Sequence, residues 1–60
     1  MAAYTLYFLN SAGLIVGHAV LQCESDEEAD LKARALQDGR DMELWDEAGV
    51  IKRYARREDA

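Results

Sequence analysis

Two stretches of this chain carry the same pattern of apolar residues around the same turn. Residues 6–15 (LYFLNSAGLI) align with residues 42–51 (MELWDEAGVI). Asn10 in the first stretch, three positions before Gly13, suits a type I turn that ends in a left-handed glycine. The asparagine can bond to the backbone of its own turn, and glycine accepts a positive φ without steric cost. Because residues 46–49 repeat this arrangement, the sequence predicts two β-hairpins.

A helix is predicted between the two hairpins. Ser25 followed three residues later by Glu28 is a capping box, and the acidic residues beside them favour the positive end of the helix dipole. Gly39 is a natural position for the residue that ends a helix. Two ion pairs with i,i+4 spacing support the helix: Glu28–Lys32 and Asp30–Arg34. We therefore expect a helix over residues 26–38.

The composition of the strands predicts their order in the sheet. The strands at 4–10 and 41–46 are the more apolar, whereas those at 14–22 and 50–55 contain glycine or cationic residues. Weak strand formers and cations are typical of sheet edges, so the first and third strands are expected in the centre, in the order 2-1-3-4. A right-handed crossover through the helix then makes every neighbouring pair antiparallel. The expected fold class is α+β, a ββαββ unit with one helix on one face of a four-stranded antiparallel sheet, in a single domain over residues 1–60.

The turn geometry also predicts the register of each hairpin. Pairing Asn10 with Leu14 gives these further pairs in the first hairpin: Leu9–Ile15, Phe8–Val16, Tyr7–Gly17, Leu6–His18 and Tyr4–Val20. The pairs expected in the second hairpin are Trp45–Ile51, Leu44–Lys52, Glu43–Arg53 and Met42–Tyr54. The opposite charges of Glu43 and Arg53 favour this register.

With this register, large apolar side chains fall on both faces of the sheet. The face expected to carry the helix collects Tyr4, Leu6, Phe8, Val16, Val20, Met42, Leu44 and Tyr54. The second face collects Tyr7, Leu9, Ile15, Leu21, Trp45 and Ile51, with the small residues Gly17, Ala19 and Ala55 between them. A solvated face of an antiparallel sheet would alternate apolar with polar residues, and one short helix cannot cover two faces.

We expect the second face to be an interface, because exposed apolar surface of this size usually marks a binding site. The simplest partner is a second copy in a homodimer, since two-fold dimers are the commonest assembly. Trp45 is the strongest single candidate for an anchor of this interface. Two alternatives stay open: residues 55–60 could fold back over this face, or the two faces could be assigned the wrong way round.

Composition limits the classes of function. The chain has 60 residues, and domains this short often need oligomerisation to bury enough apolar surface. No apolar run reaches the roughly 18 residues of a membrane span, and the start lacks the basic region of a signal peptide, so we expect a cytoplasmic protein without a membrane partner. A net charge of −5 argues against binding nucleic acid, despite the basic cluster Lys52, Arg53, Arg56 and Arg57.

No cluster of residues has the spacing of a known catalytic or metal-binding chemistry. His18 is the only histidine and Cys23 the only cysteine, and the single thiol fits a reducing compartment. The acidic residues at 24–30 lack the alternating ligands and central glycine of a calcium loop. We therefore expect neither an enzyme nor a metal or cofactor site.

The pattern YTLYFLNxxGxI over residues 4–15, the capped acidic helix, Glu43-Leu44-Trp45 and the closing hairpin resemble a group of short alphaproteobacterial proteins of about this length. The resemblance covers nearly the whole chain. The group has no assigned activity, so the resemblance implies a bacterial, cytoplasmic origin and carries over no catalytic or binding residue.

Three functional hypotheses follow. The first is a non-enzymatic protein-interaction module that binds itself, or another protein, through the second sheet face. In the second, a small-ligand-binding regulatory domain holds an apolar molecule between subunits, in a groove beside Tyr7 and Trp45. The third is an acidic partner of a basic protein, acting like an antitoxin or inhibitor through the helix carboxylates.

Overall fold

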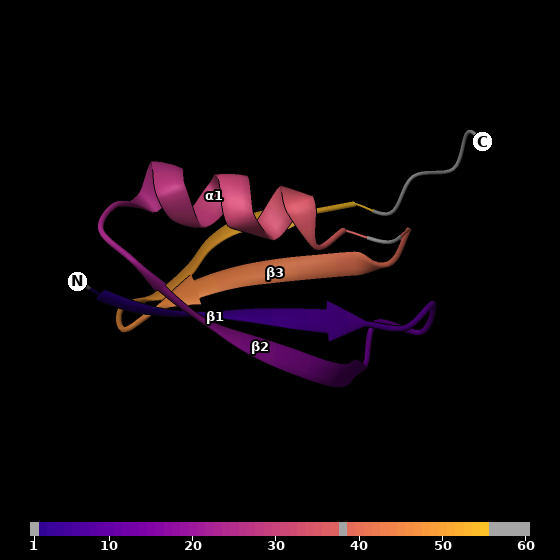
Figure 1. Ribbon diagram of the computed structural model, residues 1–60. Helices are drawn as coiled ribbons and strands as arrows, with labels where there is room; N and C mark the ends of the chain where they lie inside the picture. Colours follow the sequence, from indigo (N-terminus) through magenta and orange to yellow (C-terminus); the bar gives the residue numbers. More distant parts are fainter. Residues whose placement is uncertain (1, 38, 56–60) are drawn as a thin grey trace.

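The computed structural model describes residues 2–37 and 39–55, and these form one sheet and one helix. The elements are β1 (Ala2–Leu9), β2 (Ile15–Cys23), α1 (Asp26–Ala35), β3 (Asp41–Asp46) and β4 (Gly49–Tyr54). The sheet order is β2-β1-β3-β4, and each neighbouring pair is antiparallel. Figure 1 shows α1 lying along one face of the sheet. The predicted α+β fold class and strand order are confirmed. Residues 56–60, which make up most of the segment left open as a cover for the second face, lie outside the described residues.

Both predicted turns are held by the side chain at their first position. The Oδ1 atom of Asn10 accepts hydrogen bonds from the amides of Ala12 at 2.9 Å and Leu14 at 3.0 Å. Asp46 accepts from two amides of its own turn, at 2.8 and 3.0 Å. The glycine that ends each turn has a positive φ, 83° at Gly13 and 137° at position 49, so the glycine is needed there.

In the second hairpin, the predicted register is correct for three of the four pairs. Glu43–Arg53, Leu44–Lys52 and Met42–Tyr54 are paired as expected. Trp45 instead lies opposite Val50, which leaves Ile51 as an extra residue at an irregularity of the ladder. The Glu43 and Arg53 side chains form the expected ion pair, with 3.4 Å between Oε2 and Nε.

In the first hairpin, the predicted register is correct as far as the pair Leu9–Ile15 and wrong beyond it. Leu9 lies opposite Ile15 as expected, but the ladder then shifts by one residue and leaves Val16 unpaired. The pairs that follow are Phe8–Gly17, Tyr7–His18, Leu6–Ala19, Thr5–Val20 and Tyr4–Leu21. A shift of one residue exchanges the two faces of a strand. Gly17, Ala19 and Leu21 therefore lie on the helix side, and Val20 on the opposite side, contrary to the prediction.

The helix begins where the capping box predicts. Ser25 Oγ accepts a hydrogen bond from the Glu28 amide at 3.2 Å, and Glu28 Oε1 accepts from the Glu24 amide at 2.8 Å. The bond from the Glu24 amide lowers the pKa of the Glu28 carboxyl. The expected ion pairs are present, with 3.6 Å between Lys32 and Glu28 and 3.0 Å between Arg34 and Asp30.

The helix ends earlier than predicted. Its last residue is Ala35 and Leu36 is its C-cap, so the expected range of 26–38 is too long; Asp38 lies outside the described residues. The amides at 36 and 37 bond to carbonyl groups three residues earlier, which tightens the last turn and stops the helix. Gly39 has a positive φ of 96°, but it lies beyond this cap rather than forming it.

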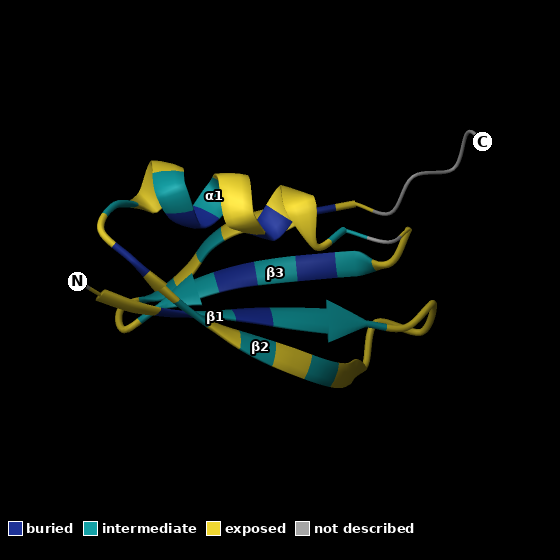
Figure 2. Ribbon diagram, viewed as in Figure 1, coloured by how far each residue is buried: buried dark blue, intermediate teal, exposed yellow. Residues whose placement is uncertain are grey.

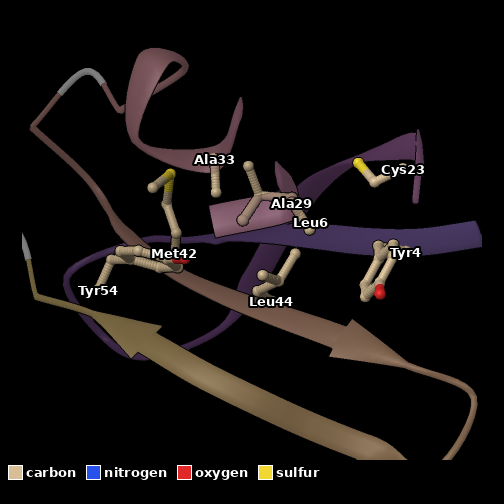
Figure 3. Close-up of a cluster of buried hydrophobic side chains, with 8 residues drawn as sticks. All are labelled: Tyr4, Leu6, Cys23, Ala29, Ala33, Met42, Leu44 and Tyr54. Atoms are coloured by element: carbon tan, nitrogen blue, oxygen red, sulfur yellow. The ribbon is translucent and has the colours of Figure 1, made fainter. Parts of the chain in front are cut away.

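The core lies between α1 and the sheet face that it covers (Figure 3). Its buried residues are Tyr4, Leu6, Cys23, Ala29, Ala33, Met42, Leu44 and Tyr54. The helix contributes only two of these, Ala29 and Ala33, whose small side chains let the helix backbone approach the sheet closely. Phe8, Leu21 and Ile51 pack against this cluster and are partly buried.

Two tyrosine hydroxyls attach the helix to the sheet. Tyr4 Oη in β1 donates to Asp26 Oδ1 at 2.7 Å, and Tyr54 Oη in β4 donates to Asp30 Oδ1 at 2.6 Å. Lys52 Nζ lies 3.4 Å from the same Asp30 oxygen. The hydrogen bond to Asp26 raises the pKa of Tyr4 to about 12, while burial and the bond to Asp30 raise the pKa of Tyr54. The bond from Tyr54 in turn lowers the pKa of Asp30, so the Tyr54–Asp30 pair is a hydroxyl donor on a carboxylate at neutral pH.

Removing the Tyr54 hydroxyl is expected to destabilise the fold. Tyr54→Phe leaves the half-buried Asp30 carboxylate without its 2.6 Å donor, which should lower the free energy of unfolding by about 1–2 kcal/mol. Urea denaturation followed by far-UV circular dichroism measures the change. The matched control is Tyr7→Phe, because the Tyr7 hydroxyl, unlike those of Tyr4 and Tyr54, forms no hydrogen bond with another described residue. Equal losses of stability in the two variants would contradict the role assigned to Tyr54.

Stability should decline at both ends of the pH scale for different reasons. The pKa values of Asp30 and Glu28 are lowered by folding, so their contribution is present above about pH 4 and is lost as pH falls through the folded values. The pKa of Tyr4 is raised from 10.0 to about 12, so its contribution is complete below pH 10 and is lost as pH rises towards 12. Urea midpoints across pH should show a plateau between these limits. Tyr4→Phe should lose less stability than the parent between pH 10 and 12, and an unchanged alkaline decline would refute this assignment.

Candidate interaction surface

The sheet face without the helix, here called the open face, is mainly apolar. The strand pairs and the alternation of buried positions place these residues on it: Ala3, Thr5, Tyr7, Leu9, Ile15, Val16, His18, Val20, Gln22, Asp41, Glu43, Trp45, Val50 and Arg53. Its large apolar members form the open-face patch: Tyr7, Leu9, Ile15, Val16, Val20, Trp45 and Val50. The patch draws on all four strands, so it depends on the complete sheet.

Four of the six residues expected at an interface lie in this patch, namely Tyr7, Leu9, Ile15 and Trp45. The other two, Leu21 and Ile51, pack against the core cluster instead. Leu21 changes face because of the extra residue in β2, and Ile51 is itself the extra residue in β4.

The patch also contains three valines that the sequence reasoning did not place there. Val16 and Val20 were expected on the helix side, and Val50 was assigned to neither face. The polar residues of β2 could have revealed the right face. His18 and Gln22 have the same parity as Val20, and polar residues mark the solvated side of an edge strand.

Aromatic rings occupy the centre of the open face. The Tyr7 and Trp45 rings pack edge to face, with centroids 5.9 Å apart and an angle of 87°. His18 lies on the other side of Tyr7, with ring centroids 6.2 Å apart. Three neighbouring strands thus contribute one ring each, and edge-to-face contact holds the two larger rings in a defined position.

The polar groups near these rings satisfy one another. Trp45 Nε1 donates to Glu43 Oε1 at 3.1 Å, and the other oxygen of Glu43 lies 3.4 Å from Arg53 Nε. A partner covering Trp45 would leave its indole N–H bonded, and the Glu43 charge is already balanced. The cost of removing water from this part of the face is therefore reduced.

The patch is strongly exposed at its outer strands. Of the seven large apolar residues that are exposed in the described chain, four belong to it: Ile15 at 56%, Val16 at 55%, Val20 at 59% and Val50 at 44%. The exposed segments of β2 are yellow in Figure 2. A protein surface normally carries exposed apolar side chains singly, whereas here four of them lie on one side of a small domain.

The acidic residues gather elsewhere. Asp26, Glu27, Glu28 and Asp30 lie on α1, across the sheet from the open face, and Glu24 immediately precedes that helix. Three of these carboxylates are engaged: Asp26 with Tyr4, Glu28 with Lys32, and Asp30 with Tyr54, Arg34 and Lys52. Five of the twelve acidic residues of the chain therefore lie on or beside the helix, on the side away from the patch.

Other features offer less chemistry. Cys23 is fully buried in the core, and within residues 2–37 and 39–55 no three His, Cys, Asp or Glu side chains are grouped to hold a metal. A groove of about 310 Å³ at one end of the sheet is lined by Leu9, Asp41, Met42, Glu43, Arg53, Tyr54 and Ala55. A second groove, at the other end, is lined by Ala2, Ala3, Tyr4, Gln22, Asp46, Glu47 and Ala48. Neither lining includes Tyr7 or Trp45, beside which the ligand-binding hypothesis places a groove between subunits.

Comparisons with protein-family models, curated proteins and solved structures give no match. The resemblance to short alphaproteobacterial proteins stays a prediction, and function must be argued from the surface itself. No helix formed by the described residues has the length and apolar character needed to cross a membrane.

Proposed function

We propose that this protein is a small, non-enzymatic interaction module that associates with a second copy of itself through the open face. The observation that carries the proposal is the open-face patch, in which exposed aliphatic side chains surround the packed rings of Tyr7 and Trp45. Tryptophan and tyrosine are the residues that most often supply binding energy at the centre of an interface.

The distribution of charge favours a second copy as the partner. Two copies of a chain with a net charge of −5 repel each other, but contact between their open faces keeps the two acidic helices on the outside. The open face itself carries Asp41, Glu43 and Arg53, of which the last two are paired with each other. Face-to-face packing of two sheets about 10 Å apart is a common arrangement and needs no change in the fold.

The area of the open face indicates a weak association. Four strands about 4.8 Å apart and roughly six residues long cover about 400 Å². A standard interface buries about 800 Å² from each partner, so a single pair of open faces reaches about half of that. We therefore expect a dissociation constant in the micromolar range rather than the nanomolar range.

A charge placed in the patch should separate the copies. Val50→Lys puts an ammonium group on the open face at a position that is already 44% exposed, so the fold should persist. Burying that charge against an apolar partner is unfavourable, and we expect the dissociation constant to rise at least tenfold. Sedimentation velocity across a concentration series measures it.

The matched control is Leu31→Lys, which makes the same charge change on the helix at a position that is 66% exposed. It should leave the association unchanged. A parent protein that stays monomeric at about 100 µM, or equal effects of the two substitutions, would overturn the proposal.

The two remaining hypotheses have no specific observation in their favour. A ligand-binding domain needs a cavity, but the rings of Tyr7 and Trp45 line neither groove. An acidic inhibitor needs free carboxylates, whereas Asp26, Glu28 and Asp30 bind side chains of their own chain.

A further inference from the structure

The two edges of the sheet are protected to different degrees. β4 forms one edge and carries Lys52 and Arg53, and charged side chains of this kind hinder the addition of another strand. β2 forms the other edge, and its nine residues include no proline, aspartate, glutamate, lysine or arginine. Such a strand presents main-chain donors and acceptors to any strand that can align with it.

The part of β2 that is suited to pairing has defined ends. At one end, Lys32 Nζ donates to the Gln22 carbonyl at 3.2 Å, so the helix occupies an acceptor there. At the other end, the extra residue Val16 breaks the regular ladder. Residues 17–21 lie between them, follow the regular pairing with β1 and are long enough for a short antiparallel ladder.

We propose that residues 17–21 of β2 pair antiparallel with the same residues of a second copy, so that two sheets join into one of eight strands. Self-pairing places each residue opposite another residue of the same strand, and like charges in such positions repel. β2 brings no lysine, arginine or carboxylate to this junction, whereas self-pairing of β4 would place Lys52 and Arg53 close to their own copies. The charge pattern therefore identifies β2 as the edge that fits a second copy.

The side chains beside the junction leave room for a second strand. On the helix side of the sheet, β2 carries the small residues Gly17 and Ala19. A Cβ atom built at Gly17 meets only the Phe8 ring, at 3.9 Å, which is an ordinary van der Waals contact. Leu21 is the one large residue of the segment on that side; it packs against the core cluster, and in this pairing it lies opposite Gly17 of the second copy.

This pairing deepens the proposed function and, where it concerns the open face, rests on it. A two-fold axis normal to the sheet keeps both helices on one side and joins the two open faces on the other. The joined face covers about 800 Å², twice the estimate for one copy, and reaches the size that a standard interface buries per partner. Two joined pairs can then pack face to face, giving four copies related by perpendicular two-fold axes.

The test uses two substitutions at Gly17, which lies in the proposed junction but not on the open face. Gly17→Lys has room for its Cβ atom and adds a cation to the edge, so the strand should fold but repel its own copy. Gly17→Thr is the matched control, because it adds a neutral residue that favours strands. For each protein, sedimentation velocity gives the mass, and NMR hydrogen exchange gives the protection of the amides at 17–21.

In the parent protein, successive amides over residues 17–21 should all be protected, because alternate amides bond to β1 and to the second copy. In Gly17→Lys, the alternate amides that point outward should exchange at least 100-fold faster, and the largest assembly should halve in mass. Gly17→Thr should behave like the parent. Fast exchange of alternate amides in the parent itself would overturn the pairing, even if Gly17→Lys failed to fold.

Val50→Lys separates this inference from the proposed function. It should halve the mass while leaving the β2 amides protected, because it lies on the open face and away from the β2 edge. If Val50→Lys has no effect while Gly17→Lys exposes the β2 amides, the open-face proposal fails and the edge pairing stands. If Gly17→Lys changes neither mass nor exchange, the edge pairing fails whatever Val50→Lys does.

Discussion

The rest of the structure depends on the fact that a ten-residue helix covers one face of a four-stranded sheet, while no other helix or strand of the described residues covers the opposite face. The helix contributes two buried alanines to the core, so its direct apolar contact with the sheet is small. The Tyr4 and Tyr54 hydroxyls add polar attachment from β1 and β4 to successive turns of the helix. Because the small side chains allow a close approach, both tyrosine rings can lie in the core while their hydroxyls reach carboxylates at the helix surface.

The turns, the start of the helix and the strand order could be predicted from short stretches of sequence. The turns follow from Asn10 and Asp46, whose side chains bond to amides within a few residues, and the start of the helix follows from Ser25 and Glu28. The strand order was also predictable, because the charged residues of β4 and the weak strand formers of β2 are typical of edges. Each of these inferences needs only a few neighbouring residues.

The register of the first hairpin was not predictable in this way. The turn fixes the pairing of Leu9 with Ile15, but an extra residue such as Val16 leaves no mark in the turn itself. Where the ladder shifts depends on which residues of β2 fit against the core, and Leu21 and Cys23 fit there. The helix was likewise predicted too long, because its last turn is tightened and ends at Ala35, before Gly39. Of the residues predicted on the second face, Tyr7, Leu9, Ile15 and Trp45 therefore lie on the open face, whereas Leu21 and Ile51 pack against the core.

The likeness between the two hairpins is consequently greater in sequence than in structure. Phe8 and Leu44 are equivalent in the repeat, yet Phe8 pairs with Gly17 while Leu44 pairs with Lys52, one position earlier in the alignment. The shift gives β2 an outward row of Val16, His18 and Val20, whereas the corresponding edge strand β4 turns Lys52 towards Asp30 of the helix.

The two edges of the sheet therefore make different contacts. β4 directs a cation to the helix, where Lys52 and Arg34 offset the charge of Asp30. β2 contains no lysine or arginine, and Lys32, which comes from the helix, donates to the Gln22 carbonyl of this strand. Association through β2 and the open face would therefore bury apolar and main-chain groups rather than ion pairs. Such contacts depend little on ionic strength, and added salt would screen only the repulsion between the outward-facing acidic helices.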